Sequence, residues 1–205
     1  MRLFVAIALP EDVRRELSAA RDAVRRELRG KQVAWTRDEN FHITLKFLGE
    51  VADGEVDRIC RRIGQGPLTD AFRLRLGGVS SLPPRGPARV IVADIAGDLE
   101  IAGNLAGRID RICNEVGVPL ERRKFNPHIT LGRVKEKIAW KRNREASEGL
   151  AFDVEEIHVM RSEVGKDGSV YSTIARARLG RGTEKAKSPG TLTIKTGTLP
   201  LFRRT

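Results

Sequence analysis

The chain has 205 residues, of which 40% are hydrophobic and 32% are charged. This balance excludes a compositionally disordered chain, and no apolar run approaches the roughly 20 residues that a membrane helix needs. The formal net charge is +11; six basic residues against one acidic residue after position 180 supply +5, which leaves +6 for residues 1–180. A basic surface attracts polyanions, and nucleic acid is the commonest of these in a cytoplasm.

The first residues of the chain and its cysteines suggest a cellular location for the protein. The first ten residues carry one charge and a short apolar run, which is typical of a buried strand rather than of a signal peptide. Cys60 and Cys113 are too few for a disulfide framework and form no CxxC pair, so we expect free thiols. We therefore predict a cytoplasmic protein without a membrane partner, with a monomer as the default state.

Hydropathy patterns predict alternating strands and helices up to a loop over residues 80–87. That loop, Ser-Ser-Leu-Pro-Pro-Arg-Gly-Pro, is the strongest loop signal in the chain. Before it, the apolar spacing predicts strands over residues 3–8, 33–35, 41–48 and 72–76, and helices over residues 13–28 and 56–63. Gly30 and Gly64 close the two helices.

The same order begins again after the loop. We expect a helix over residues 105–116 and strands over residues 90–95, 128–134, 152–160 and 169–179. The sequence Gly-Lys-Asp-Gly at 165–168 predicts a hairpin turn between the last two strands. These patterns predict an α+β fold: one bilobal domain over residues 1–180, with two similar lobes around a central cleft. Each lobe would have a mixed or antiparallel sheet with packed helices, and the lobes would meet near residues 80–88. Residues 181–205 are predicted to form a flexible basic tail, in which only Leu192-Thr-Ile could pair.

The tetrapeptide His-Ile-Thr-Leu occurs in both parts of the chain and contains two of its three histidines. Residues i and i+2 of a strand share a face and lie about 6.6 Å apart, so the His and Thr of each motif point one way and the Ile and Leu point into the core. A rough twofold relation between lobes would place the two His/Thr pairs across a cleft. The residues of the two motifs are His42, Ile43, Thr44, Leu45, His128, Ile129, Thr130 and Leu131.

Two imidazoles in one cleft can serve one substrate as general acid and general base. The neutral threonine hydroxyls can hold the non-bridging oxygens of a phosphodiester, a reaction that needs no covalent nucleophile. Ligands at metal spacing are missing around both motifs, so we expect no metal and no other cofactor. The third histidine, His158, stands alone on a predicted strand and is expected to be structural.

The sequence resembles the 2H phosphoesterase superfamily, which is defined by two His-x-Thr/Ser-x motifs. Within it, the segments RLFVAIALP, FHITLKFLGEV, NPHITLGRV and SEVGKDGSVYSTIARARL are similar to those of bacterial and archaeal RNA 2′,3′-cyclic phosphodiesterases, also called 2′-5′ RNA ligases. The resemblance covers about residues 1–180. It implies a bilobal α+β fold with a basic cleft. It also implies metal-independent opening of RNA 2′,3′-cyclic phosphate ends to 2′-phosphates, together with reversible 2′-5′ ligation of certain RNA ends.

The resemblance also implies roles for the motif residues. His42 takes the role of general acid and His128 that of general base, although identical motifs leave the order open in the sequence itself. Thr44 and Thr130 match the family's phosphate-contacting positions.

Basic and aromatic residues surround the motifs. Lys46 is four residues after the first histidine, so regular alternation puts it on the same face and predicts a phosphate contact. Arg133 is five residues after the second histidine and matches a basic position of the family, but it needs a bulge or a strand end to reach phosphate. We expect the run at 122–124 (Arg-Arg-Lys) to lie in a solvated loop, with RNA backbone contact as the second interpretation. Phe41 and Phe125 are expected in the core rather than stacked on a base.

Two other functions stay open at this stage. The protein could bind RNA ends without turnover, as its basic body suggests. It could also be a phosphodiesterase for small cyclic nucleotides or for an ADP-ribose cyclic phosphate.

Overall fold

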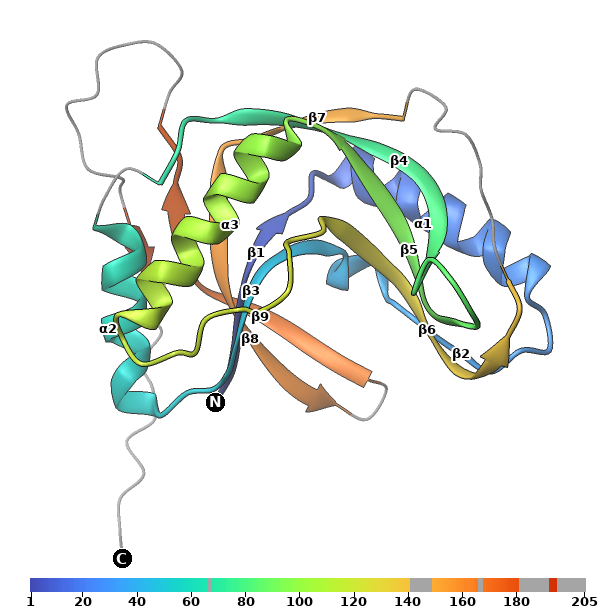
Figure 1. Ribbon diagram of the computed structural model, residues 1–205, viewed down its shortest axis with the longest axis horizontal. Helices are drawn as coiled ribbons and strands as arrows, with labels where there is room; N and C mark the ends of the chain where they lie inside the picture. The colour runs from blue at the N-terminus through green and yellow to red at the C-terminus, as the bar shows by residue number, and fades with distance from the viewer. Residues whose placement is uncertain (66–67, 141–148, 166–167, 181–191, 195–205) are drawn as a thin grey trace, which may run out of the picture.

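The computed structural model describes residues 1–65, 68–140, 149–165, 168–180 and 192–194 (Figure 1). No helix in these ranges is long and apolar enough to cross a membrane. The helices are α1 (Glu11–Glu27), α2 (Asp53–Gly64), α3 (Leu99–Asn114) and the short 3-10 helix η1 (Asp38–Asn40). The strands are β1 (Arg2–Ala8), β2 (Val33–Trp35), β3 (His42–Glu50), β4 (Phe72–Leu82), β5 (Ala88–Gly97), β6 (His128–Ile138), β7 (Ala151–Val154), β8 (Glu156–Gly165), β9 (Gly168–Arg178) and β10 (Leu192–Ile194).

The strands form one curled sheet, in the order β10-β9-β8-β1-β3-β6-β5-β4-β7, with β2 added beside β6. Each pairing between these strands is antiparallel. The sheet has two halves, β10 to β3 and β6 to β7, which meet where Ile43 of β3 pairs with Ile129 of β6. Three helices with one antiparallel sheet confirm the predicted α+β class.

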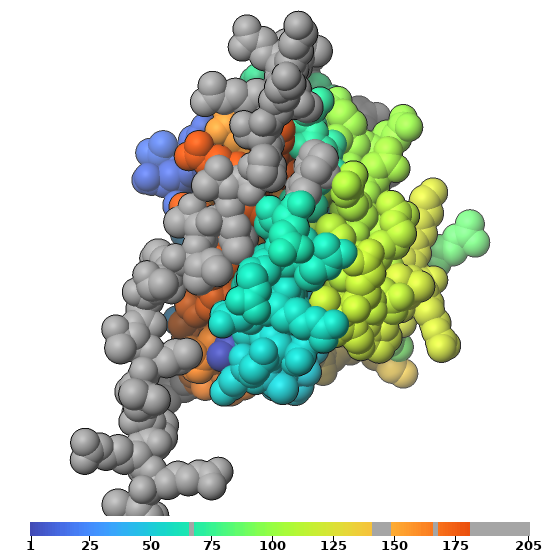
Figure 2. Space-filling model, turned by 90° about the vertical axis from the view of Figure 1, so that its left-hand side faces the viewer, coloured from blue at the N-terminus to red at the C-terminus, as the bar shows by residue number. Residues whose placement is uncertain are grey.

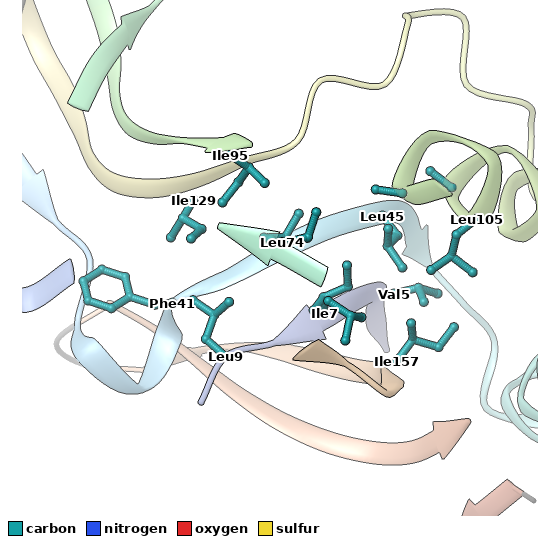
Figure 3. Close-up of a cluster of buried hydrophobic side chains, with 14 of the residues drawn as sticks. Val5, Ile7, Leu9, Phe41, Leu45, Leu74, Ile95, Leu105, Ile129 and Ile157 are labelled. Atoms are coloured by element: carbon teal, nitrogen blue, oxygen red, sulfur yellow. The ribbon is translucent and has the colours of Figure 1, made fainter. Parts of the chain in front are cut away.

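The helices cover one face of the sheet, which we call the core face. In α1, the apolar positions Val13, Leu17 and Val24 are buried, while acidic residues in its first turn and basic residues in its last turn complement the helix dipole. α1 contacts β6, α3 contacts β3, and α2 contacts β9. α2 and α3 also lie side by side, as Figure 2 shows. The buried side chains of Figure 3 come from both halves of the sheet and from α3, and they form one continuous core.

The chain crosses between the halves more often than its hydropathy suggests. The apolar stretch 152–160 is not one strand: β7 pairs with β4, and after Glu155 the chain continues as β8 beside β1 in the other half. The segment 80–88, where the lobes were expected to meet, contains the end of β4 and the start of β5. Because β4 and β5 pair with each other, this connection lies within one half of the sheet.

Several strands are longer than their patterns indicate. β4 continues from Leu76 to Leu82 across a register shift, and β6 extends beyond Val134 to Ile138. The expected hairpin joins β8 to β9, with Gly165 paired to Gly168, while its two turn residues lie outside the described ranges. In the tail, Leu192–Ile194 pair with β9, and the rest of residues 181–205 lies outside the described ranges.

Candidate active site

The junction between the two halves brings the repeated motifs together. Ile43 and Ile129 face each other across β3 and β6, and both are fully buried on the core face. Antiparallel pairing about this point places His42 beside Thr130 and Thr44 beside His128 on the opposite face, which we call the histidine face. The two His/Thr pairs, predicted to meet across a cleft, therefore occupy neighbouring strands of one sheet.

Both histidine rings are held in the same way. Nδ1 of His42 lies 2.8 Å from the carbonyl oxygen of Asn40, and Nδ1 of His128 lies 2.8 Å from that of Asn126. A carbonyl oxygen can only accept, so each Nδ1 carries the proton and each Nε2 is left for proton transfer. In the first motif, the Thr44 hydroxyl lies 3.0 Å from Nε2 of His42. Each asparagine is thus a positioning residue, two positions before its histidine.

Both strands carry a β-bulge directly after the motif threonine. On β1 the neighbours Val5 and Ala6 pair with Lys46 and Thr44, so Leu45 is the extra residue of β3. On β5 and β6 the same shift makes Leu131 the extra residue after Thr130. A bulge reverses the alternation of the residues that follow it. The burial pattern of the six residues that begin at each histidine is accordingly the same.

The bulge of β3 corrects the expectation for Lys46. The side chain points to the core face, is 4% exposed, and its Nζ lies 2.6 Å from a carboxylate oxygen of Asp110 on α3. Nζ also donates to the carbonyl oxygen of Pro119 (2.6 Å). The predicted phosphate contact assumed regular alternation, and the bulge removes it. Lys46 joins α3 to the sheet instead of facing the histidines.

The bulge of β6 has the opposite consequence for Arg133. It turns this side chain to the histidine face, where it is exposed. This is the bulge that Arg133 was expected to need in order to reach the phosphate. The equivalent position on β3 is Phe47, which is 59% exposed and whose ring centroid lies 6.3 Å from that of Phe4. The position equivalent to Lys46 is Gly132, where a Cβ would come within 3.0 Å of both Val33 and Trp35. The two halves thus repeat the backbone but exchange a cation for an aromatic ring.

Burial and nearby charges both act on the His42 ring. Burial is the largest effect on His42 and lowers its pKa below the usual value. The hydrogen bond to the Asn40 carbonyl opposes this effect, while electrostatic interaction with His128 and Arg133 lowers the pKa further. Arg133 therefore acts electrostatically on the His42 ring. A lower pKa makes the protonated ring a stronger acid and also lowers the fraction of the protein in which the ring is protonated at neutral pH.

We expect Arg133→Gln to raise the pKa of His42, because the substitution removes a nearby positive charge. An NMR titration of the His42 ring signals would measure the shift. Arg122→Gln, which removes the same charge from an exposed loop, is the control and should leave the titration unchanged. An unchanged or lowered pKa in Arg133→Gln would show that the guanidinium does not act on this site.

Sequence reasoning missed the surroundings of the histidines. The ring of His42 packs against Phe4 at 4.9 Å and against the edge of Tyr171 at 5.4 Å, measured between centroids. Asp94 of β5 pairs with His128 and accepts a hydrogen bond from the Ser80 hydroxyl (2.7 Å). These residues come from distant parts of the chain and carry no local signal. The asparagines were within reach, since each lies two residues before a motif histidine.

The remaining candidates lie where they were expected. Phe41 is buried and Phe125 packs against the core, and the run 122–124 lies in an exposed loop. Both ring nitrogens of His158 have protein partners, Thr173 at 3.2 Å and Glu156 at 2.7 Å, as a structural histidine requires. The described residues contain no group of three His, Cys, Asp or Glu side chains placed to hold a metal ion.

Comparison with known proteins agrees with this geometry. The family model described as "LigT like Phosphoesterase" matches residues 7–92 and 99–171. A Thermus thermophilus protein named RNA 2′,3′-cyclic phosphodiesterase is 34% identical over 197 residues, with 93% of this chain and 97% of the relative covered. An Archaeoglobus fulgidus protein of the same name is 28% identical, with 85% of this chain and 98% of the relative covered.

Solved structures share the fold. A crystal structure of a protein from Thermus thermophilus superposes with a TM-score of 0.71 at 32% identity and covers 89% of this chain and 100% of its own. The crystal structure of LigT from E. coli in its apo form has a TM-score of 0.74 at 23% identity and covers 88% of this chain and 98% of its own. With both motifs inside the matched ranges, the chain belongs to the LigT-like phosphoesterase family.

Proposed function

We propose that the protein hydrolyses RNA 2′,3′-cyclic phosphate ends to 2′-phosphomonoesters, with the two motif histidines as general acid and general base. The observation that carries the proposal is the pairing of Ile43 with Ile129, which sets His42 and His128 on one face of neighbouring strands. Both rings keep Nε2 for proton transfer because each Nδ1 is bound to a carbonyl oxygen. The names of the curated relatives support the substrate class.

In the proposed reaction, a water molecule attacks the cyclic phosphorus while His128 takes a proton from it. The bond from phosphorus to O3′ breaks, and His42 gives its proton to O3′ as negative charge develops there. The products are a 2′-phosphate and a free 3′-hydroxyl, so one water has been added. This order of roles follows the family resemblance.

The groups beside the histidines would bind the phosphate. The hydroxyls of Thr44 and Thr130 lie on the histidine face and can donate to the non-bridging oxygens without adding charge. Arg133 would balance the negative charge that grows in the transition state. Lys46 has no part in this proposal, because it is buried against Asp110. The same proton transfers would serve a 5′-hydroxyl of RNA in place of water, which would form a 2′-5′ linkage.

The direct test is to incubate the protein with an RNA that ends in a 2′,3′-cyclic phosphate, in excess chelator. We expect a 2′-phosphate product, resolved from the 3′ isomer, at the same rate with and without the chelator. A 3′-phosphate product would contradict the proposed leaving group. Loss of turnover in chelator that added metal restores would contradict the two-histidine mechanism. A folded protein that binds the RNA but makes no product would support the binding role.

We also infer that residues 1–180 act as one domain. The end of this range supplies β8 and β9 to the half that contains β1, and β7 to the half that contains β4. Each half of the sheet therefore contains strands from before and from after the 80–87 segment. The monomeric state and the cytoplasmic location stay predictions, and sedimentation of the purified protein would measure the first.

A further inference from the structure

The histidine face continues along β6 as a row of cations. Arg133 is followed on the same strand by Lys135 and Lys137. Val134 packs against the core and Ile138 is 5% exposed. The register of β6 against β5 shifts between Arg133 and Ile138, so this stretch does not follow regular alternation. Arg133, Lys135 and Lys137 are all exposed, and this exposure places the three cations on the surface along one strand.

These cations are free to meet a ligand. All three side chains are exposed, and none forms an ion pair with any residue that the structure describes. The one acid within the row, Glu136, is exposed as well, and its carboxylate accepts a hydrogen bond from the backbone N–H of Gln32. Exposed lysines without acidic partners are the groups that bind phosphates of a nucleic acid strand.

The first half of the sheet has no such row. After its bulge, β3 carries Phe47 where β6 carries Arg133, and a second register shift follows between Phe47 and Gly49. Lys46, the one lysine of β3, is buried on the core face. Of the two motif strands, only β6 therefore continues the positive charge that begins at the site.

We propose that Lys135 and Lys137 bind the backbone phosphates of an RNA strand whose cyclic phosphate end lies at the two histidines. This inference rests on the proposed function and narrows its substrate class to an RNA strand of several nucleotides rather than a mononucleotide. Arg133 contacts the reacting phosphate, and the two lysines contact phosphates further from the end. Their contribution is electrostatic, so it depends on strand length and on salt.

The test uses the full chain with the double substitution Lys135→Gln and Lys137→Gln. Two substrates are compared, a nucleoside 2′,3′-cyclic phosphate and an RNA hexamer with the same end. We expect kcat/KM for the hexamer to fall roughly 2- to 30-fold, the range for two exposed ion contacts, and kcat/KM for the mononucleotide to stay unchanged. The salt dependence of hexamer affinity should weaken by about 1.4 in log-log slope, since a single strand gives about 0.7 per phosphate contact.

A matched control removes the same charge elsewhere. Arg108 and Arg111 on α3 are exposed and form no ion pair with any described residue, so Arg108→Gln with Arg111→Gln should leave both substrates unaffected. The proposed row would be overturned if the control lost as much kcat/KM as the lysine variant. It would also be overturned if the lysine variant lost kcat/KM equally on both substrates or lost none on the hexamer. Affinity for a hexamer that ends in a 2′-phosphate, read by fluorescence anisotropy, tests the row without turnover. If the unchanged protein hydrolyses neither substrate, the proposed function fails. The affinity of the double variant for this hexamer, compared with that of the unchanged protein, still shows whether Lys135 and Lys137 bind RNA.

Discussion

The substitution His128→Gln is expected to lower kcat for hydrolysis of an RNA 2′,3′-cyclic phosphate by roughly 10²- to 10⁴-fold, and His42→Gln by a similar factor. This is the range for loss of one general acid or base. Glutamine keeps a polar side chain of similar length but cannot exchange a proton at neutral pH. Thermal unfolding should change little in His128→Gln, whose ring has only the Asn126 carbonyl as a hydrogen-bond partner among the described residues.

A substrate with sulfur in place of O3′ separates the two roles. A thiolate leaves without protonation far more readily than an alkoxide, because the pKa of a thiol is near 8.5. If His42 is the acid, His42→Gln should recover much of its lost rate on this substrate, and His128→Gln should not. Recovery in His128→Gln alone would exchange the two assignments. Full activity of either variant on the natural substrate would remove that histidine from the mechanism.

The sequence allowed the two motifs to be found because period-2 alternation is a local property. The spacing of His42 and Thr44 required only that each motif form a strand, and the burial of Ile43 and Ile129 bears this out. The sequence could not indicate that these two isoleucines pair directly. That contact depends on the order of strands in the sheet, and β3 and β6 are separated by α2, β4, β5 and α3 along the chain.

The bulges explain why the neighbouring charges could not be placed from the sequence. Regular alternation put Lys46 with the histidines and Arg133 on the other face, and one extra residue in each strand reverses both positions. A bulge is set by the register with a partner strand, here β1 or β5, so a single strand contains little sign of it. A comparison of the two motifs does show that Lys46 aligns with Gly132, a residue without a side chain. The structure gives the reason, since a Cβ at Gly132 would clash with Val33 and Trp35 on the core face.

The aromatic surroundings of His42 were beyond local reasoning for a similar reason. Phe4 belongs to β1, which lies beside β3, and Tyr171 belongs to β9, which β8 and β1 separate from β3. Both contacts with the His42 ring therefore depend on the order of strands in the sheet. The division of residues 152–160 between β7 and β8 is another long-range effect. Both segments are apolar because both are strands with buried faces, so the composition gives no mark where the chain leaves one half of the sheet for the other.

The ion pair of Lys46 with Asp110 leads to the largest expected effect on stability. We expect Asp110→Ala to lower the free energy of unfolding by about 3 kcal/mol, because a buried lysine loses its charged partner. The figure is at the lower end of the range for broken buried pairs, since the Asp110 side chain is 17% exposed. The carboxylate also accepts from the backbone N–H of Glu121 (3.1 Å), so its loss loosens the segment after α3 as well. Urea denaturation would measure the change.

Lys46→Met separates this structural role from a catalytic one. Methionine keeps the apolar stem and removes the charge, while Asp110 retains the Glu121 N–H and partial solvent contact. In the Asp110→Ala background, Lys46→Met should therefore recover part of the lost stability, because it removes the unpaired charge. Lys46→Met alone should keep kcat/KM per folded molecule. Additive losses in the double variant would contradict the ion pair. A drop in kcat/KM with unchanged stability would contradict the structural role and return Lys46 to the phosphate site.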